Sequence, residues 1–367
     1  MLWKKFLSPL VTVAILCVSL TVTAPVAQAA GVGIIGSVAG TLIKGAAMRS
    51  EVRKIIKQYN ETPEGQAALY QQFREKVGVD DSIEYNERLD RIMANLTKGV
   101  AAVDPTINDK PYKYFVAAQD ELNAACAMGR VMLVNRGTFK TLPNDDEIAA
   151  IVGHEMGHGQ KNHAAKGLEK QVNQQITSGL LGAALGGGAI TSLLTDIALN
   201  HTDAHKSKKF ETEADSLSMD YLVNTPYNIG ATAAVMQRFV ELSIGKERSR
   251  AQALFKPGDH PDSARRRDAC AKKLFEYSGK HAQVKDGVVS VNKKMFMKPV
   301  AADNMSGAER SYFVLGNLAR AYHDGQNKYE ATVVNGTVML GRQEIVTPAD
   351  GDEDAQILAD RLNAIRN

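Results

Sequence analysis

Two histidines and a glutamate stand at a spacing that suits metal chemistry. The chain reads His154-Glu155-Met156-Gly157-His158. On a helix, residues four apart share one face, so both imidazoles can bind a single Zn²⁺ while Glu155 takes a proton from the attacking water. Zinc is favoured because it lowers the pKa of water and polarises a peptide carbonyl without redox chemistry. Five residues alone are weak support, so the rest of the chain must supply the site.

A catalytic zinc needs a third protein ligand. In the metzincin pattern, a histidine would stand at position 164 and a glycine at 161, but those positions hold Ala164 and Lys161. That class is therefore excluded. His163 is one residue out of place, and we expect it on the solvent side of the helix.

A glutamate is the other common third ligand, and Glu211 is the first one after Glu169. Asp215 follows one helical turn later on the same face. Glu211 can therefore bind the metal, while Asp215 accepts a hydrogen bond from the free ring nitrogen of a ligand histidine. Glu213 points elsewhere and is predicted to be a solvated charge.

The elements that position these residues are mostly helical. Pro143, the potential cap Asn144 and Glu147 three residues later predict the start of a helix that carries both histidines. Apolar spacing predicts three further helices, and β-prone runs predict a small sheet. The predicted helices are Leu142 to Ala165, Ile83 to Val103, Lys208 to Val223 and Ile229 to Leu242, and the predicted strands are Tyr112 to Ala118 and Val131 to Asn135.

After about Lys280 the sequence changes character. It predicts a separate α+β module over residues 281–367, in which we recognise neither an internal repeat nor a chemical motif. Its predicted elements are a strand at Gly287 to Val291, a helix at Gly307 to His323, a hairpin at Glu330 to Val346 turning at Asn335-Gly336, and a helix at Glu353 to Ile365. A protein partner is one interpretation of this module.

The first 29 residues have the parts of a secretory signal: Lys4 and Lys5, an apolar run, and small residues at Ala27 and Ala29. We therefore expect residues 1–29 to be removed and residues 30–280 to form the metallopeptidase domain of an exported protein, periplasmic or extracellular. An uncleaved membrane anchor is the alternative. Removing both lysines lowers the net charge from +3 to +1, which does not indicate a nucleic-acid partner.

Two further features leave alternatives open. Cys126 and Cys270 remain after cleavage and can either form one disulfide or stay as buried thiols. Residues Ile176 to Leu199 are rich in Gly, Ala, Leu and Ile. They suit a packed helical hairpin or, alternatively, peripheral contact with a membrane.

Several motifs together resemble peptidase family M48, the group with HtpX-like and CAAX prenyl proteases, and in particular its soluble, exported bacterial branch. They are the HEMGH sequence, Glu211 followed by Ala214-Asp215, Leu122-Asn123-Ala124 before a strand, and His260-Pro261 followed by Arg266. The resemblance runs from about Asn86 to Leu274. It implies a mainly helical α+β gluzincin domain, zincin-like, with one zinc ion per chain held by His154, His158 and Glu211.

The resemblance also implies roles for residues beyond the ligands. Glu155 is the general base and Asp215 supports a ligand histidine. His260 lies in a loop that in soluble relatives reaches the zinc as an inhibitory fourth ligand, and Arg266 stabilises oxyanion charge near the cleft. The alternatives are a loop-anchoring hydrogen bond for His260 and a structural salt bridge for Arg266.

The family holds substrate on an edge strand, which the resemblance places at Gly129, Arg130, Val131 and Met132. Relatives usually carry Pro-Gly-Gly where this chain has Met128-Gly129-Arg130. Because β-addition uses backbone hydrogen bonds, a peptide could still pair there.

Three functions follow as hypotheses. The first is a zinc endopeptidase that cleaves polypeptides, namely unfolded or misassembled cell-envelope proteins. The second is a latent zincin, kept closed by His260, that acts mainly as a chaperone-like assembly factor. The third is a membrane-acting protease for lipidated substrates, which requires residues 176–199 to insert into a bilayer.

Overall fold

A computed structural model describes residues 34–142, 144–177, 207–244 and 262–367. The signal sequence predicted for residues 1–29, residues 178–199 of the Gly-rich stretch, and His260 lie outside this range. The chain divides into two compact units, residues 1–44 and residues 45–367. The second unit includes helix α1 (Ile34–Glu61) from residue 45 onward.

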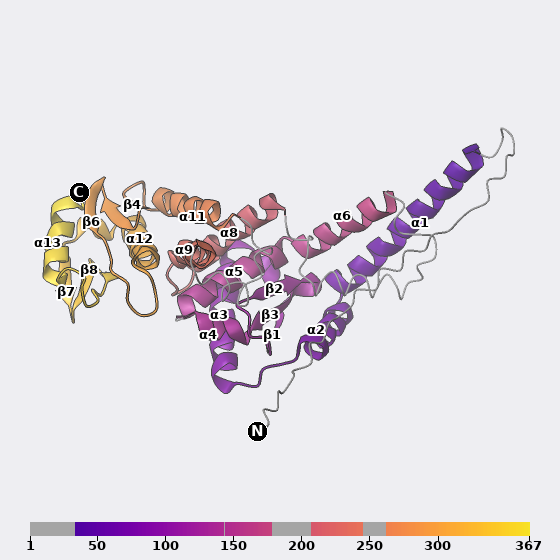
Figure 1. Ribbon diagram of the computed structural model, residues 1–367, viewed down its shortest axis with the longest axis horizontal. Helices are drawn as coiled ribbons and strands as arrows, with labels where there is room; N and C mark the ends of the chain where they lie inside the picture. Colours follow the sequence, from indigo (N-terminus) through magenta and orange to yellow (C-terminus); the bar gives the residue numbers. More distant parts are fainter. Residues whose placement is uncertain (1–33, 143, 178–206, 245–261) are drawn as a thin grey trace, which may run out of the picture. The chain divides into compact units, whose positions relative to one another are not determined.

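A three-stranded sheet lies beside the helices that carry the site (Figure 1). Its strands are β1 (Lys113–Ala117), β2 (Ala124–Ala127) and β3 (Val131–Asn135), in the order β1-β3-β2. Strand β3 pairs in parallel with β1 and antiparallel with β2. The predicted sheet is confirmed, but strand β2 was not predicted.

Helices surround this sheet and bury the positions expected from their periodicity. Helix α3 begins and ends at the predicted residues, and its apolar positions Leu89, Ile92, Met93 and Leu96 are buried. Helix α5 packs against α3, α8, α9 and β2, which places it at the centre of this part of the fold. The helices are α2 (Pro63–Val77), α3 (Ile83–Val103), α4 (Arg136–Thr141), α5 (Asp145–Gln160), α6 (His163–Thr177), α8 (Lys208–Val223), α9 (Ala231–Ile244) and α11 (Ser263–Tyr277), with 3₁₀ turns at Pro105–Ile107 and Met128–Arg130.

The predicted helix Leu142 to Ala165 is two helices. Asn144 caps α5 as expected, because its side chain accepts a hydrogen bond from the Glu147 N–H at 2.9 Å. The chain then turns at Asn162, whose φ of 52° cannot continue a right-handed helix. Helix α6 therefore leaves in a new direction that starts at His163.

The C-terminal segment contains two units with the same order, three antiparallel strands followed by a helix. Helix α12 packs on β4, β5 and also β9, while α13 packs on β7, β8 and also β6. The expectation that this module lacks a repeat is therefore wrong at the level of structure. The first unit is β4 (Ala282–Lys285), β5 (Val288–Val291), β6 (Lys294–Met297) and α12 (Gly307–His323); the second is β7 (Ala331–Val334), β8 (Thr337–Leu340), β9 (Gln343–Val346) and α13 (Ala355–Ile365), with a 3₁₀ turn at Gln326–Lys328 before β7.

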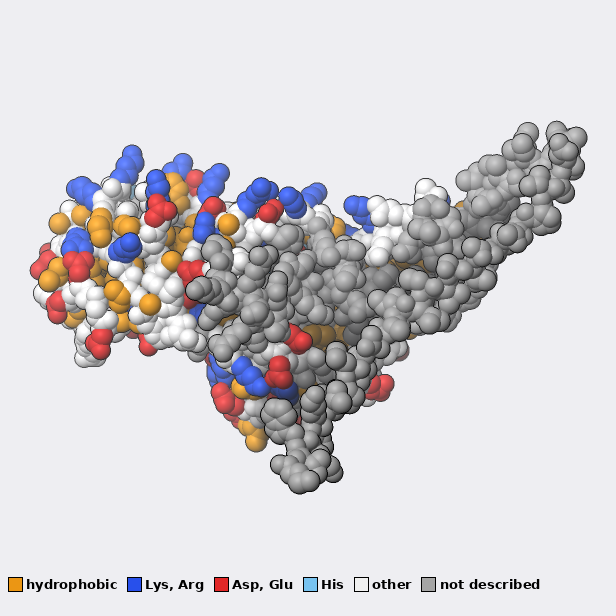
Figure 2. Space-filling view, in the orientation of Figure 1, with side chains coloured by type: hydrophobic (Ala, Val, Ile, Leu, Met, Phe, Trp, Pro, Cys, Tyr) orange, Lys and Arg blue, Asp and Glu red, His pale blue; other side chains and the backbone are white. Residues whose placement is uncertain are grey.

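The observed architecture is the predicted mainly helical α+β fold with small sheets. Within the described ranges, no helix is both long and apolar enough to cross a membrane. Over the C-terminal strands and helices, Figure 2 shows charged side chains of both signs interspersed with hydrophobic ones.

A buried ionic cluster joins α5, α9 and α12. Arg238 Nε lies 3.1 Å from Glu147 Oε1 and 3.3 Å from Glu309 Oε1, and all three residues are buried. Burial raises the pKa of both carboxyls, that of Glu309 to about 7, although Arg238 opposes the shift. One arginine therefore faces two carboxyls, and the proton on Glu309 relieves the excess negative charge.

This cluster predicts a pH-dependent stability. The pKa of Glu309 is higher in the folded chain than its usual value, so its contribution is present at low pH and is lost as pH rises through about 7. The free energy of unfolding should therefore fall between about pH 5 and pH 8, by on the order of 3 kcal/mol. Denaturant unfolding at several pH values measures this fall, and for Glu309→Gln the free energy of unfolding should fall less steeply with pH than for the parent protein. The exposed Glu330→Gln serves as the control. If Glu309→Gln shows the same pH dependence of the free energy of unfolding as the parent protein, the role of Glu309 is contradicted.

Candidate metal centre

Helix α5 brings both histidines into a buried position against α8. Its glycines make this close contact possible: a Cβ added to Gly157 would lie 3.0 Å from Ala214 Cα, and one added to Gly153 would lie 3.0 Å from Ser218 Oγ. Ser218 Oγ also donates to the Ala150 carbonyl at 2.8 Å. The close packing carries the start of α8, where Glu211 lies, to the face of α5 that bears the histidines.

Three donor groups converge at this contact. His154 and His158 approach each other to 3.0 Å between their Nε2 atoms. Glu211 Oε1 lies 3.3 Å from His158 Nε2, and Glu211 Oε2 lies 3.6 Å from His154 Nε2. All three are buried and together could hold a metal ion. A tetrahedral zinc with ligands at about 2.0 to 2.1 Å would space its donors by about 3.3 Å, which these distances bracket.

The protonation of the imidazoles also fits a cation. His154 Nδ1 lies 2.9 Å from Asp215 Oδ1, and burial lowers the pKa of His154, so a neutral ring donates from Nδ1 and leaves a lone pair on Nε2. His158 Nδ1 is likewise engaged, by His163. When both Nδ1 atoms carry the proton, two lone pairs face each other at 3.0 Å, an arrangement that a cation between them stabilises.

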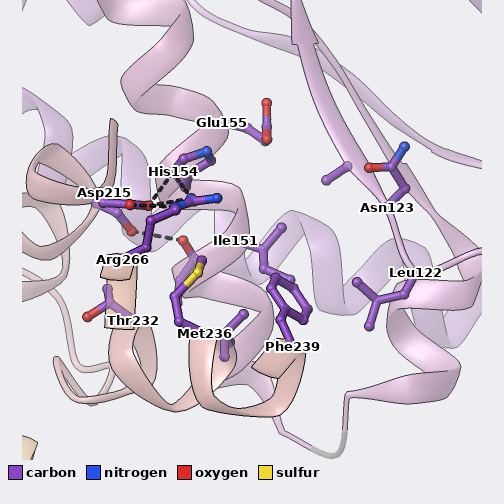
Figure 3. Close-up of a pocket in the computed structure, with 14 residues that line it drawn as sticks. Leu122, Asn123, Ile151, His154, Glu155, Asp215, Thr232, Met236, Phe239 and Arg266 are labelled. Atoms are coloured by element: carbon purple, nitrogen blue, oxygen red, sulfur yellow. Dashed lines mark hydrogen bonds and ion pairs between the residues drawn. The ribbon is translucent and has the colours of Figure 1, made fainter. Parts of the chain in front are cut away.

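Asp215 and Arg266 form the support behind His154 (Figure 3). Arg266 binds Asp215 through two hydrogen bonds, of 2.7 Å from Nε and 2.6 Å from Nη2, and its Nη1 lies 3.1 Å from Glu211 Oε2. Burial opposes both charges, yet Arg266 and His154 hold the pKa of the Asp215 carboxyl well below its usual range. The guanidinium thus contacts two carboxylates, which supports the structural salt bridge that the sequence left open.

His163 is the main site residue that sequence reasoning misplaced. It is fully buried rather than solvent-facing, with Nδ1 3.0 Å from His158 Nδ1 and its ring stacked on Phe210. Its Nε2 lies 3.3 Å from a carboxylate oxygen of Glu213, which is half-exposed and paired rather than simply solvated. Burial lowers the pKa of His163 to about 4, so a neutral ring can accept from His158 and donate to Glu213.

Glu155 is also buried, and its orientation is fixed by the sheet. Its Oε2 accepts a hydrogen bond from the backbone N–H of Cys126, on β2, at 2.9 Å. The carboxyl therefore lies between the metal-binding face of α5 and the outer side of β2. Sequence reasoning could not find this contact, because it involves a backbone group in a strand that carries no β-prone residue.

The predicted substrate strand at Gly129 to Met132 is wrong. Val131 and Met132 belong to β3, which pairs on both sides and has no open edge. Gly129 and Arg130 precede it in a turn with φ of 72° and 58°, and the buried Arg130 donates to the carbonyls of Thr106 and Lys110. The edge strand beside Glu155 is β2.

Cys126 and Cys270 are both buried as separate thiols. Burial raises the pKa of each, that of Cys270 to about 12, so both remain protonated and unreactive near neutral pH. Of the two alternatives left open for these cysteines, the structure thus shows buried thiols and not a disulfide.

Comparison with known proteins agrees with this geometry. The model for peptidase family M48 matches residues 84–273, close to the range inferred from the motifs. Metalloprotease LoiP of Escherichia coli K12 is 30% identical over 175 residues, which are 47% of this chain and 66% of the relative. Metalloprotease YcaL of the same strain is 27% identical over 175 residues, again 47% of this chain and 65% of the relative.

A beta-barrel assembly-enhancing protease of E. coli O157:H7 is 23% identical over 141 residues, 36% of this chain and 28% of the relative. The chain thus spans just under two thirds of the first two relatives and less of the third. The C-terminal strands and α12 and α13 lie outside the family match. Since that match covers more than half of the chain and includes all the residues that converge at the centre, the chain belongs to peptidase family M48.

Proposed function

We propose that this protein is a zinc-dependent endopeptidase that hydrolyses peptide bonds in unfolded or misassembled cell-envelope proteins. The observation that carries the proposal is the convergence of three buried donors beside a glutamate held by the sheet. His154, His158 and Glu211 would hold one zinc ion. When bound, zinc acts as a Lewis acid that polarises the peptide carbonyl and lowers the pKa of water.

Glu155 would act as the general base. Its carboxylate accepts a proton from the attacking water and returns it to the amine that leaves. The hydrogen bond from Cys126 N–H fixes one carboxylate oxygen, so the base keeps its direction without rotating. Its buried position also strengthens the electrostatic effect of its charge on the reacting atoms.

We assign positioning roles to Asp215, Arg266 and His163. Asp215 fixes the ring of His154, and Arg266 holds Asp215 and approaches Glu211. His163 would fix the ring of His158 in the same way. To stabilise oxyanion charge, the guanidinium of Arg266 would also have to reach the substrate. Its contacts with two carboxylates make that role less favourable.

The substrate would bind along β2. The Cys126 N–H points away from β3, so by the alternation of a strand the backbone groups of Ala124 also point outward. Among the described strands, none pairs with this outer edge of β2. An extended peptide can therefore add there through backbone hydrogen bonds.

An envelope location is supported by the secretory signal predicted for residues 1–29 and by the name of the beta-barrel assembly-enhancing relative. The C-terminal units would serve to bind a partner, and the latent, His260-closed state stays a prediction. No described residue favours a membrane-acting protease for lipidated substrates over an endopeptidase for cell-envelope proteins.

The proposal predicts that Glu155→Gln abolishes catalysis but keeps the metal. Cleavage of an unfolded protein such as casein should fall by about 10²- to 10⁴-fold, because the base is lost. Zinc content measured by atomic absorption should remain one ion per chain, and chelation should inactivate the parent protein. The exposed Glu84→Gln is the matched control. Cleavage that survives both Glu155→Gln and chelation would refute the proposal.

The contact between His163 and His158 predicts an effect on metal affinity. His163→Phe keeps a buried ring on Phe210 but removes the nitrogen that faces His158. The zinc dissociation constant should rise by about 10- to 100-fold, as for other groups that orient a ligand histidine. Competition with a fluorescent zinc chelator measures it. His281→Phe, at a ring stacked on Tyr322, is the control, and equal affinity in both variants would contradict the role.

A further inference from the structure

The two C-terminal units can be compared position by position. Each strand of the second unit begins and ends 49 residues after its counterpart in the first. The positions that face the packed helices hold buried apolar residues in both sheets. The corresponding pairs are Ala282 and Ala331, Val289 and Val338, Val291 and Leu340, Phe296 and Ile345, and Met297 and Val346. Both units therefore meet the same packing requirement.

The charges of the two units differ. Residues 282–298 contain four lysines and one aspartate, a net charge of +3, whereas residues 331–347 contain one arginine and one glutamate, a net charge of zero. The lysines and their counterparts are Lys285 and Val334, Lys293 and Arg342, Lys294 and Gln343, and Lys298 and Thr347. Lysine on an exposed strand can discourage pairing with other chains, but the strands of the second unit have none. The fold alone thus does not require these lysines.

Strand register defines an exposed face on the first sheet. Lys285 pairs with Val288, and Ser290 pairs with both Gln283 and Met295. Side chains alternate along a strand, and the two other residues of β5 are buried, so these five residues point away from the packed helices. Met295, in the middle of the face, is 52% exposed.

Four exposed lysines flank Met295. Lys285 and Lys298 lie at the end of the sheet next to the β4–β5 turn, and Lys293 and Lys294 lie at the opposite end, where β6 begins. None of the four forms an ion pair with another described residue. The outward positions of the three strands hold no acidic residue. We call this set of residues the basic face: Lys285, Lys293, Lys294, Lys298 and Met295.

The chemistry of the basic face suits a bilayer that contains anionic phospholipids. Lysine binds phosphate as a point charge on a flexible stem, without the fixed bidentate geometry of arginine. Such groups match phosphates that are spread over a surface and move within it. Met295 adds an apolar side chain that can enter the boundary between headgroups and acyl chains. An acidic polypeptide would match the charges alone.

We propose that the basic face binds the surface of an anionic phospholipid bilayer, with its lysines against the headgroup phosphates and Met295 at the interface. This contact is peripheral, lies outside the family match, and is separate from the contact predicted for residues 176–199. No residue of the metal centre takes part in it. The inference therefore goes beyond the proposed peptidase function and does not depend on it.

Sedimentation with vesicles tests the proposal on the purified, exported protein. Vesicles that contain equal amounts of phosphatidylcholine and phosphatidylglycerol should bind it at least about tenfold more strongly than vesicles of phosphatidylcholine alone. Added salt should weaken the binding, because it screens the lysine charges. Equal binding to both kinds of vesicle overturns the inference.

Removing two lysines should weaken the binding without affecting the fold. Lys285→Gln combined with Lys298→Gln should lower the partition coefficient by about 10- to 30-fold, because each lysine near an anionic surface contributes about fivefold. Arginine at both positions keeps the charge and should bind like the parent protein. Lys98→Gln combined with Lys328→Gln is the matched control, since both lysines are exposed and lie outside the basic face. An equal loss in both double variants would show that only net charge matters and would overturn the assignment.

A variant at Met295 tests the centre of the face. Met295→Glu introduces the residue type that the second unit carries at the corresponding position, Glu344, so the first sheet should keep its fold. The partition coefficient should fall by about tenfold or more, because the new charge faces the phosphates. Unchanged binding of this variant would contradict the placement of Met295 at the interface.

Two further outcomes would overturn the inference. If every variant binds vesicles like the parent protein, another part of the chain makes the contact. If vesicles do not bind, but polyglutamate binds the parent protein and not the Lys285→Gln, Lys298→Gln variant, the basic face is a site for acidic polypeptides. Neither outcome bears on the peptidase function, because cleavage of casein measures that function separately.

Discussion

The close packing of α5 on α8 is the constraint on which the rest of the site depends. At Gly157 the two helices approach so closely that a methyl group would press on the backbone of Ala214. This approach brings Glu211 to within 3.3 Å of His158. A side chain at position 157 would push α8 outward, and because a donor atom must lie within a few tenths of an ångström of its place, the metal geometry would be lost first.

Such close packing concentrates charge that must be balanced. Glu211 and Asp215 are two buried carboxylates on one face of α8, and neither is solvated. Arg266, from α11, contacts both and keeps their mutual repulsion from separating the helices. Buried ion pairs contribute little net stability, but removing one partner leaves an uncompensated charge. The arginine therefore lets the donors stay assembled before any cation arrives.

The sequence predicted the helices well and the relations between elements poorly. Helices α3, α8 and α12 have the predicted bounds because an apolar stripe at 3.6-residue spacing is a local signal. Strand β2 is Ala-Ala-Cys-Ala, which lacks the β-branched residues that mark a strand. The central position of β3 in the sheet, with β2 at its edge, depends on pairing between strands, which no local pattern encodes.

Local sequence signals were enough to find the three converging donors, but not to place His163. His154 and His158 are related by helical spacing, and Glu211 is distinguished by the absence of nearer glutamates. The placement of His163 against His158 depends on the turn at Asn162, which rotates the next helix by an amount that spacing does not reveal. Extending α5 as one helix through this turn is what placed His163 on the solvent side.

Helix α9 links a pocket beside His154 and Glu155 to the C-terminal units. One side of it supplies Val235, Met236 and Phe239 to the pocket. Elsewhere it packs against α12. Gly230, directly before α9, meets Gly316 with no room for a Cβ, and Arg238 contacts Glu309. A boundary near residue 280 remains a reasonable prediction for the chain. In the packed structure, however, helix α9 both lines this pocket and packs against α12, so a displacement of α12 would be transmitted to the side chains that line the pocket.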